Sequence, residues 1–219
     1  MIKAILFDLD MTLIDFMSLK RVASARAAQA MVKEGLKMRV KDAERELFKF
    51  YLDWGIESND AFTKFLKKHN AYSDRAVAVA VNAYHKAKYE HLKPYKGVTK
   101  VLQKLKAKGL KLAVVTDAPR IKAYQRLDSM KILKFFDCVV GFEDTGRSKP
   151  SKLPFKKALQ SLKVKPSEAM MVGDWPERDI KGAQKLGMKT CWAKYGWHTG
   201  KPAKADYEIN RIEEVLNVV

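Results

Sequence analysis

The apolar run in Ile5-Leu6-Phe7-Asp8-Leu9-Asp10-Met11-Thr12 stops on two acidic residues, at the point where a buried strand would be expected to end. Side chains two residues apart in a strand point to the same side, so Asp8 and Asp10 could converge on one ligand. In an open parallel sheet, ligands bind just beyond the carboxyl ends of the strands. Acidic residues also follow strands where the junction is merely solvated, so the meaning of this pair depends on the rest of the chain.

The composition indicates a globular, cytoplasmic protein. The chain has 219 residues, of which 47% are hydrophobic, and it can therefore bury a full core as one large domain or as one domain with an inserted module. No apolar run approaches the roughly 18 residues that cross a bilayer. The two acidic residues also interrupt the N-terminal run that a signal peptide would need. We therefore expect a cytoplasmic location and no membrane partner.

The net charge is strongly positive, since 43 Lys and Arg stand against 25 Asp and Glu and give +18. The basic residues are spread over nearly every helix-like segment, which is typical of a solvated, lysine-rich surface. Such a surface would attract anionic ligands, including phosphorylated metabolites, and would attract nucleic acid nonspecifically. No aromatic-rich RNA-binding motif or zinc finger accompanies the charge, so we expect no specific nucleic-acid partner. The sequence does not indicate the oligomeric state.

From Lys93 onward, apolar runs alternate with segments of helical period, which predicts strand-helix-strand units and a parallel sheet. Residues 98–105 show i, i+3, i+4, i+7 spacing of apolar side chains, and Gly109 supplies the residue that ends such a helix. We expect strands at 110–115, 137–142, 169–172 and 188–193, and a weaker one at 207–209. Helices are expected between them around Tyr124 and Leu127 and at 155–162, 180–186 and 212–216.

Residues 16–92 differ from the rest of the chain because they carry helical periodicity and almost no β-branched runs. Two apolar stripes at helical spacing run through residues 40–54 and 77–87, and Ser58 and Ser73 are placed as N-caps. The segment falls after the first strand and before the next strand of the α/β pattern. We therefore predict an α/β domain of residues 1–15 and 93–219 with an inserted, all-helical domain of residues 16–92.

Distinctive polar groups occur in or near the loops that follow four of the predicted strands. In a parallel sheet these strand ends lie at the same edge, so residues far apart in the sequence become neighbours. We therefore expect the four groups to form one site. They are Asp8, Asp10 and Thr12 after the first strand, Thr116 and Asp117 after the second, Lys149-Pro150 beyond the third, and Gly173-Asp174 with Asp179 after the fourth.

These motifs resemble, in order and spacing, those of the haloacid dehalogenase (HAD) superfamily, and the resemblance covers essentially the whole chain. The matching segments are Asp8-Leu9-Asp10-Met11-Thr12 for D-x-D-x-T, Thr116 for the second-motif hydroxyl, Lys149-Pro150 for the third-motif lysine, and Gly173-Asp174 to Asp179 for G-D-x-x-x-x-D. The resemblance implies a Rossmann-like parallel sheet flanked by helices, with residues 16–92 as the helical cap domain. Two positions depart from the commonest pattern: Met11 replaces a frequent glycine, and Asp117 stands where asparagine is usual.

The activity that the resemblance implies is Mg²⁺-dependent hydrolysis of a small phosphorylated metabolite through an aspartyl-phosphate intermediate. Asp8 would be the nucleophile, which splits one hard displacement into two easier ones. Asp10 would protonate the leaving alkoxide and then deprotonate the attacking water. Attack by an anion on a phosphate dianion is opposed by ~4 kcal/mol per like-charge pair near 4 Å at an effective dielectric constant of about 20, so cations must offset it.

The resemblance also implies how the remaining residues bind. Mg²⁺ prefers oxygen ligands and would be held by the side chains of Asp8 and Asp174 and the backbone carbonyl of Asp10. Behind these groups, Thr12 and Asp179 would support the ligands, with Asp179 steadying the lysine or metal-bound water. The substrate phosphate would be bound by Thr116, Asp117 and Lys149.

Three alternatives to a phosphatase agree with the sequence to different degrees. Within the family, enzymes that expel halide lack the second aspartate, so Asp10 argues against a dehalogenase. A phosphomutase of the β-phosphoglucomutase kind carries the same motifs, and the sequence does not separate it from a phosphatase. A noncatalytic nucleic-acid-binding or scaffold protein is motivated only by the charge of +18.

Overall fold

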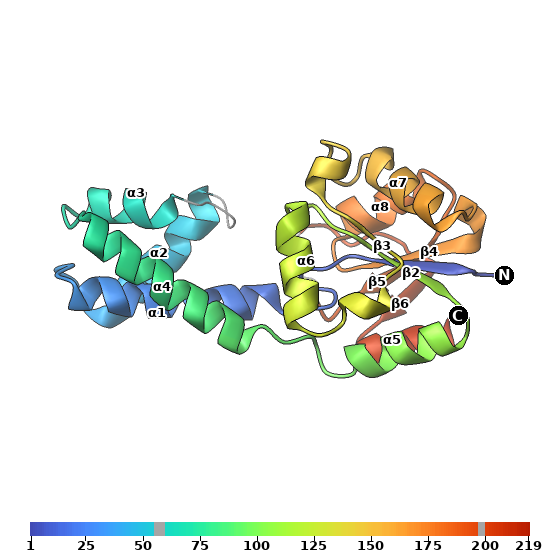
Figure 1. The fold of residues 1–219 in the computed structure, drawn as a ribbon. Coiled ribbons are helices and arrows are strands. Elements are labelled where there is room, and N and C mark those ends of the chain that lie inside the picture. Colours follow the sequence, from blue (N-terminus) through green and yellow to red (C-terminus); the bar gives the residue numbers. More distant parts are fainter. Residues whose placement is uncertain (55–59, 197–199) are drawn as a thin grey trace. The chain divides into compact units, whose positions relative to one another are not determined.

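The computed structural model describes residues 1–54, 60–196 and 200–219 (Figure 1). The chain forms two compact units, one of residues 1–15 and 93–219 and the other of residues 16–92. The first unit is an α/β structure, and the described part of the second is helical. The fold class predicted from the sequence is confirmed: a parallel sheet is flanked by helices, and a helical insertion forms the cap.

A six-stranded, fully parallel sheet with the order β3-β2-β1-β4-β5-β6 is the centre of the α/β unit. Its strands are β1 (Ala4–Phe7), β2 (Lys111–Val115), β3 (Cys138–Val140), β4 (Ala169–Gly173), β5 (Lys189–Ala193) and β6 (Tyr207–Ile209). The chain runs outward from β1 to β3 and then returns to β4 on the other side of β1. Strand order therefore reverses between β1 and β4, and open α/β sheets bind their ligands at such a point.

Helices cover both faces of this sheet (Figure 1). On one face lie α7 (Lys152–Leu162) and α8 (Lys181–Gln184), and α5 (Val98–Ala107) lies on the other. Leu6, Ala113 and Met171 of the three central strands pack with Phe155 and other residues of α7 in one buried cluster. Because both faces are covered, the central strands read as continuous apolar runs in the sequence.

Some helical segments differ from the expectation. The segment expected at 180–186 is a π-helical turn (Pro176–Ile180) followed by α8, and the last helix (Ile212–Asn217) is a 3-10 helix. The inward face of α6 (Arg120–Ser129) consists of Ala123, Arg126 and Leu127, whereas Tyr124 is exposed. Further 3-10 turns are Leu133–Phe135, Phe142–Asp144 and Pro166–Glu168.

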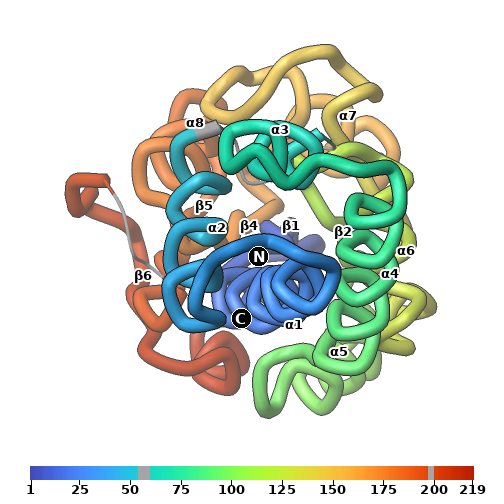
Figure 2. The backbone as a smooth tube through the Cα atoms, turned by 90° about the vertical axis from the view of Figure 1, so that its left-hand side faces the viewer, coloured from blue at the N-terminus to red at the C-terminus, as the bar shows by residue number. Residues whose placement is uncertain are grey.

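The helical unit is a small bundle whose helices enclose their own core. Helix α1 (Phe16–Lys33) packs against both α2 (Val40–Trp54) and α4 (Asp74–His91), and α3 (Ala61–Lys68) packs against α2 and α4 (Figure 2). The predicted N-cap of α4 is confirmed, because the Ser73 side chain accepts a hydrogen bond from Ala76 N at 3.1 Å. The other predicted N-cap, Ser58, lies outside the described residues. The core of the bundle includes Met31, Leu47, Phe65 and Ala80.

The two chain segments that lead into and out of the helical unit are bonded to each other within the α/β unit. Ile14 forms an antiparallel bridge with Pro94, and Tyr95 N donates to Leu13 O at 2.9 Å.

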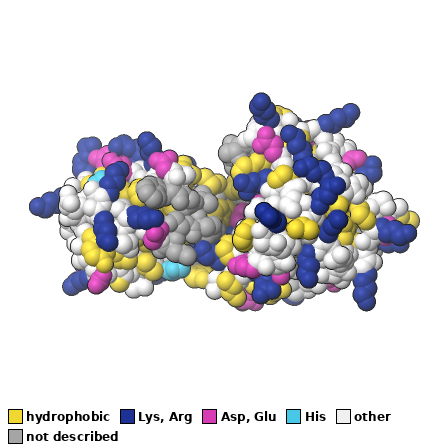
Figure 3. Space-filling model, turned by 90° about the horizontal axis from the view of Figure 1, so that it is seen from above, with side chains coloured by type: hydrophobic (Ala, Val, Ile, Leu, Met, Phe, Trp, Pro, Cys, Tyr) yellow, Lys and Arg dark blue, Asp and Glu magenta, His cyan; other side chains and the backbone are white. Residues whose placement is uncertain are grey.

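None of the described helices combines the length and the apolar character that a membrane crossing requires. On the face drawn in Figure 3, Lys and Arg side chains are scattered over both units instead of gathering in one patch.

Candidate active site

The central strands bring Asp8 and Asp174 together because β1 and β4 are neighbours in register. Phe7 pairs with Val172, and Asp8 N donates to Val172 O at 2.9 Å, so each acidic residue follows its strand almost at once. Among the described residues, Asp8, Asp174 and Asp179 form a group whose carboxylate oxygens lie within 4.8 Å of one another. All three side chains are buried.

Asp179 reaches this group because the loop after β4 folds tightly over a glycine. A Cβ atom at Gly173 would lie 2.4 Å from Cγ of Asp179, so only glycine leaves room for the carboxylate. The same carboxylate accepts a hydrogen bond from Trp175 N at 3.0 Å, which closes the loop. The sequence placed Asp179 behind the ligands, whereas the structure places its carboxylate in the same group as Asp8 and Asp174.

Lys149 supplies the positive charge of the group. Its Nζ donates to Asp8 Oδ1 at 2.5 Å and to Asp179 Oδ1 at 2.7 Å, and its side chain is only 3% exposed. Burial alone would lower the pKa of Lys149, but the carboxylates of Asp179, Asp8 and Asp117 outweigh it and raise the pKa above its ordinary value. The amine is therefore charged throughout the physiological pH range.

Three buried carboxylates thus share one ammonium group. Burial, followed by the charges of Asp8 and Asp179, raises the pKa of Asp174 to about 9. Burial also raises the pKa of Asp179 to about 7, although Lys149 opposes this. Burial therefore disfavours the ionised forms of Asp174 and Asp179, and a divalent cation bound among the acidic residues would favour them instead. Carboxylate oxygens are the ligands that Mg²⁺ prefers, so the donor set fits this metal.

We expect the metal-free protein to lose stability as the pH rises from about 5 to about 8. Because the pKa values of Asp174 and Asp179 are raised in the folded state, the folded protein binds more protons than the unfolded chain in this range. Each group then lowers the free energy of unfolding by up to about 1.4 kcal/mol per pH unit, from its unfolded pKa up to its folded pKa. Urea unfolding in EDTA at pH 5, 6.5 and 8 measures the slope, which saturating Mg²⁺ should flatten.

The Asp174→Asn variant is the matched control for this slope, because it removes the group with the more strongly raised pKa. It should unfold with a weaker pH dependence than the wild type in EDTA. Asp128→Asn, at an exposed position of α6, should keep the wild-type slope. A metal-free wild type whose stability varies no more with pH than that of Asp174→Asn would contradict the expectation.

Other contacts hold the loop after β1 in place. Thr12 Oγ1 donates to Asp174 Oδ1 at 3.1 Å, and the Tyr195 hydroxyl donates to Thr12 O at 2.7 Å. Met11 has a φ of +64°, in the left-handed region that favours glycine. This conformation accounts for the glycine that is frequent at the same position of the D-x-D-x-T motif. Gly196 allows a close approach, because a Cβ there would lie 1.6 Å from Met11 O. Sequence patterns gave no signal for Tyr195.

Trp192 is a second residue that sequence reasoning did not identify. Its Nε1 donates to Asp174 O at 3.0 Å, so β5 fixes the main chain of the loop that carries this carboxylate. In the sequence, Trp192 reads only as one apolar residue of a buried strand. The contact depends on the neighbouring positions of β4 and β5 in the sheet.

The carboxylate of Asp10 lies outside the group of three acidic residues in the part of the chain that the structure describes. Nη1 of Arg126 donates to both of its oxygens, at 2.9 Å to Oδ1 and 2.6 Å to Oδ2. The expectation that Asp8 and Asp10 point the same way assumed a strand, but β1 ends at Phe7 and residues 11–13 form a turn. Alternation of side chains therefore does not extend to Asp10.

The second motif contributes Thr116 and Asp117 at the end of β2. Thr116 is buried, and its Oγ1 accepts a hydrogen bond from Ala118 N at 3.1 Å. Asp117 Oδ1 accepts from Lys149 N at 2.8 Å, and its Oδ2 accepts from Arg178 Nη1 at 3.0 Å. A carboxylate can serve both donors, whereas the asparagine usual at this position has only one acceptor oxygen. The carboxylate of Asp117 thus connects the loops after β2, β3 and β4 by hydrogen bonds.

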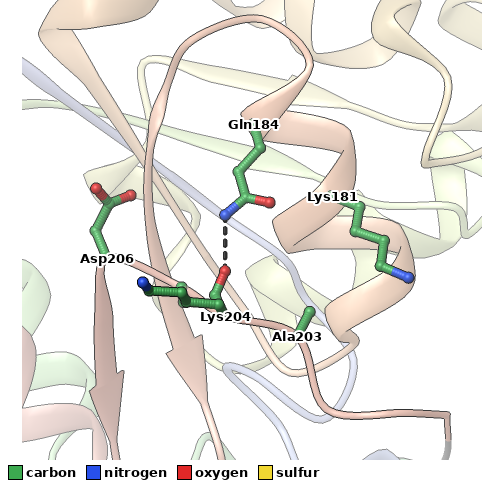
Figure 4. Close-up of a pocket in the computed structure, with 6 residues that line it drawn as sticks. Lys181, Gln184, Ala203, Lys204 and Asp206 are labelled. Atoms are coloured by element: carbon green, nitrogen blue, oxygen red, sulfur yellow. Dashed lines mark hydrogen bonds between the residues drawn. The ribbon is translucent and has the colours of Figure 1, made fainter.

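A separate pocket of about 420 Å³ lies elsewhere on the α/β unit (Figure 4). Gln184 Nε2 donates to Lys204 O at 2.8 Å across it, and Asp206 is already paired with Lys189 at 2.8 Å. None of the predicted site residues belongs to its lining, which consists of Lys181, Gln184, Ala203, Lys204, Ala205 and Asp206.

The chain matches the haloacid dehalogenase-like hydrolase family over residues 5–193 and belongs to this family. It is 35% identical over 223 residues to the glyceraldehyde 3-phosphate phosphatase of Pyrococcus furiosus, an alignment that covers the whole chain and 93% of the relative. It is 37% identical over 227 residues to the enzyme of the same name from Methanopyrus kandleri, with 100% and 97% covered. A crystal structure of a HAD phosphatase from Thermococcus onnurineus matches with a TM-score of 0.73 and 25% identity, over 99% of this chain and 97% of that one.

Proposed function

We propose that this haloacid dehalogenase-like phosphatase hydrolyses a small phosphorylated metabolite through an aspartyl-phosphate on Asp8, with glyceraldehyde 3-phosphate as the first candidate substrate. The observation that carries the proposal is the buried contact of 2.5 Å between Asp8 and Lys149, next to Asp174 and Asp179, at the point where strand order reverses. The names of relatives that are 35% and 37% identical over the whole chain support the choice of substrate.

In the first step, a carboxylate oxygen of Asp8 attacks phosphorus and the bond from phosphorus to the substrate oxygen breaks. Asp10 gives a proton to the departing oxygen. Water then attacks the aspartyl-phosphate, Asp10 takes its proton, and inorganic phosphate leaves with Asp8 regenerated. Lys149, kept charged by the carboxylates around it, offsets the repulsion between Asp8 and the incoming phosphate.

Mg²⁺ is the cofactor proposed for the acidic group. The side chains of Asp8, Asp174 and Asp179 would hold it, and the backbone carbonyl of Asp10 stays a predicted further ligand. When bound, the ion supplies positive charge that stabilises the negative charge of the phosphate in the transition state.

The phosphate would be bound by Thr116, whose hydroxyl can donate to a phosphate oxygen while accepting from Ala118 N. Lys149 would contact the same phosphate. We assign Asp117 a different task from the phosphate contact expected from the sequence, because both of its oxygens already accept hydrogen bonds from Lys149 N and Arg178. Asp117 would hold the main chain of Lys149 in place.

Phosphate release from glyceraldehyde 3-phosphate tests the proposal. We expect a kcat/KM on the order of 10⁴ M⁻¹s⁻¹ or higher with Mg²⁺, as is typical of an enzyme acting on its own substrate. Removal of the metal with EDTA should lower the rate by about 100-fold or more, because the positive charge that stabilises the phosphate in the transition state would then be lost. The comparison substrates are 2-phosphoglycolate, glycerol 3-phosphate and glucose 1-phosphate. Isomerisation of the sugar phosphate faster than phosphate release would identify a mutase instead.

A further inference from the structure

We propose that Arg126 is a positioning residue that sets the orientation of Asp10 and thereby controls the protonation of the leaving group. The proposal rests on the function proposed above, in which Asp10 is the acid and base. The carrying observation is that one guanidinium nitrogen of Arg126 donates to both carboxylate oxygens of Asp10, at 2.9 and 2.6 Å.

The position of Arg126 on its helix is unusual for a charged residue. On α6 it shares the inward face with Ala123 and Leu127, at the i, i+3, i+4 spacing that normally carries apolar side chains. Its side chain is 1% exposed, and a buried charge is strongly unfavourable unless it is paired and hydrogen-bonded. The ion pair with Asp10 contributes to that compensation through Nη1 and links α6 to the loop after β1.

The exposures of the two partners indicate which of them meets the substrate. The side chain of Asp10 is 24% exposed, whereas that of Arg126 is 1% exposed. Arg126 therefore holds the carboxylate from its buried side and is too enclosed to contact a substrate itself. Its influence on the reaction passes through Asp10.

The loop that carries Asp10 explains why such support is needed. Asp10 lies beyond the last residue of β1, and residues 11–13 form a turn, so the sheet does not fix the direction of its side chain. Two hydrogen bonds from one nitrogen restrict the rotation of the carboxylate about its side-chain bonds. General acid catalysis requires the acid within hydrogen-bond reach of the oxygen that departs, so the rate depends on this orientation.

The test compares two leaving groups with kcat/KM, which reports the steps up to formation of the aspartyl-phosphate. The alkoxide of glyceraldehyde 3-phosphate needs a proton to leave, whereas p-nitrophenolate leaves readily without one. We expect Arg126→Met to lower kcat/KM for glyceraldehyde 3-phosphate by about 100-fold, within the range that general acid catalysis contributes. The same change should lower kcat/KM for p-nitrophenyl phosphate by less than about 5-fold, because its leaving group does not need a proton from Asp10.

A double-mutant comparison separates positioning from a structural role. In an Asp10→Asn background, adding Arg126→Met should change kcat/KM for glyceraldehyde 3-phosphate by less than about 3-fold, since the residue it positions is already inactive. Arg126→Lys keeps the charge and should recover part of the loss. Gln125→Met, on the exposed face of the same helix, should behave as the wild type.

The outcomes that overturn the proposal are distinct from failure of the proposed function. An equal loss for both substrates, or an undiminished effect of Arg126→Met in the Asp10→Asn background, would show that Arg126 is only structural. If Arg126→Met does not fold, Arg126→Lys in the two backgrounds gives the same comparison. A wild type that releases phosphate from neither substrate with Mg²⁺ would overturn the proposed function, and the assignment of Arg126 with it.

Discussion

Asp8→Asn should lower kcat for phosphate release by about 10⁴-fold or more, the scale of loss found when a nucleophile is removed from a set of residues that act together. The amide has nearly the same shape as the carboxylate but is a far poorer nucleophile. The fold should persist, because the change removes one negative charge from a crowded group and leaves the contact of Lys149 with Asp179. Phosphate release measures the loss. Mass spectrometry of acid-quenched wild type should show a phosphoryl adduct on the peptide that contains Asp8.

The control for this prediction is Asp128→Asn, the same chemical change at an exposed position of the α/β unit. It should keep the wild-type kcat, and both variants should unfold at or above the wild-type urea midpoint in EDTA. A folded Asp8→Asn protein that retained a tenth of the wild-type activity would exclude Asp8 as the nucleophile.

Lys149→Met should cost both activity and stability. Removing the ammonium group leaves Asp8 and Asp179 buried without their cation, and breaking a buried ion pair in this way typically costs about 3 to 5 kcal/mol. Activity should fall by about 10³-fold, because the charge that offsets repulsion of the phosphate is lost. Urea unfolding at pH 7 in EDTA and phosphate release with Mg²⁺ measure the two effects.

A second change separates the electrostatic cost from loss of packing. Adding Asp179→Asn to Lys149→Met removes one of the two stranded carboxylates, so the double variant should be more stable than Lys149→Met by about 1 to 3 kcal/mol while remaining inactive. Lys152→Met, at an exposed position of α7, should leave stability and activity unchanged. A cost of Lys149→Met below about 1 kcal/mol would mean that the cation is not essential to the buried group.

The sheet could be predicted from the sequence because each strand is a short apolar run that ends in polar or turn residues. Once the strands are parallel, their carboxyl ends must share an edge, which is why Asp8, Lys149 and Asp174 could be expected near one another. Sequence patterns gave less information where the chain leaves the strands. The direction of Asp10 depends on the turn after β1, and the place of Asp179 depends on how tightly the loop over Gly173 folds.

Residues that act through long-range contacts could not be identified from local patterns. Arg126 reads as part of a polar helix face, and its partner Asp10 is 116 positions away. Helical spacing instead favoured Tyr124, which is exposed. Similarly, the sequence showed that Asp117 replaces the usual asparagine but not that Arg178, 61 positions later, would meet its second oxygen.

The bridge between Ile14 and Pro94 has an evolutionary consequence. The chain leaves the α/β unit and returns to it through two segments that are joined by backbone hydrogen bonding. Residues 16–92 are therefore a single insertion in the α/β unit. Insertions are best tolerated where the ends of the inserted piece emerge close together on a scaffold that does not depend on it. Lengthening, shortening or replacing this insertion in a descendant gene would therefore leave the strand order, and the acidic group at the edge of the sheet, unchanged.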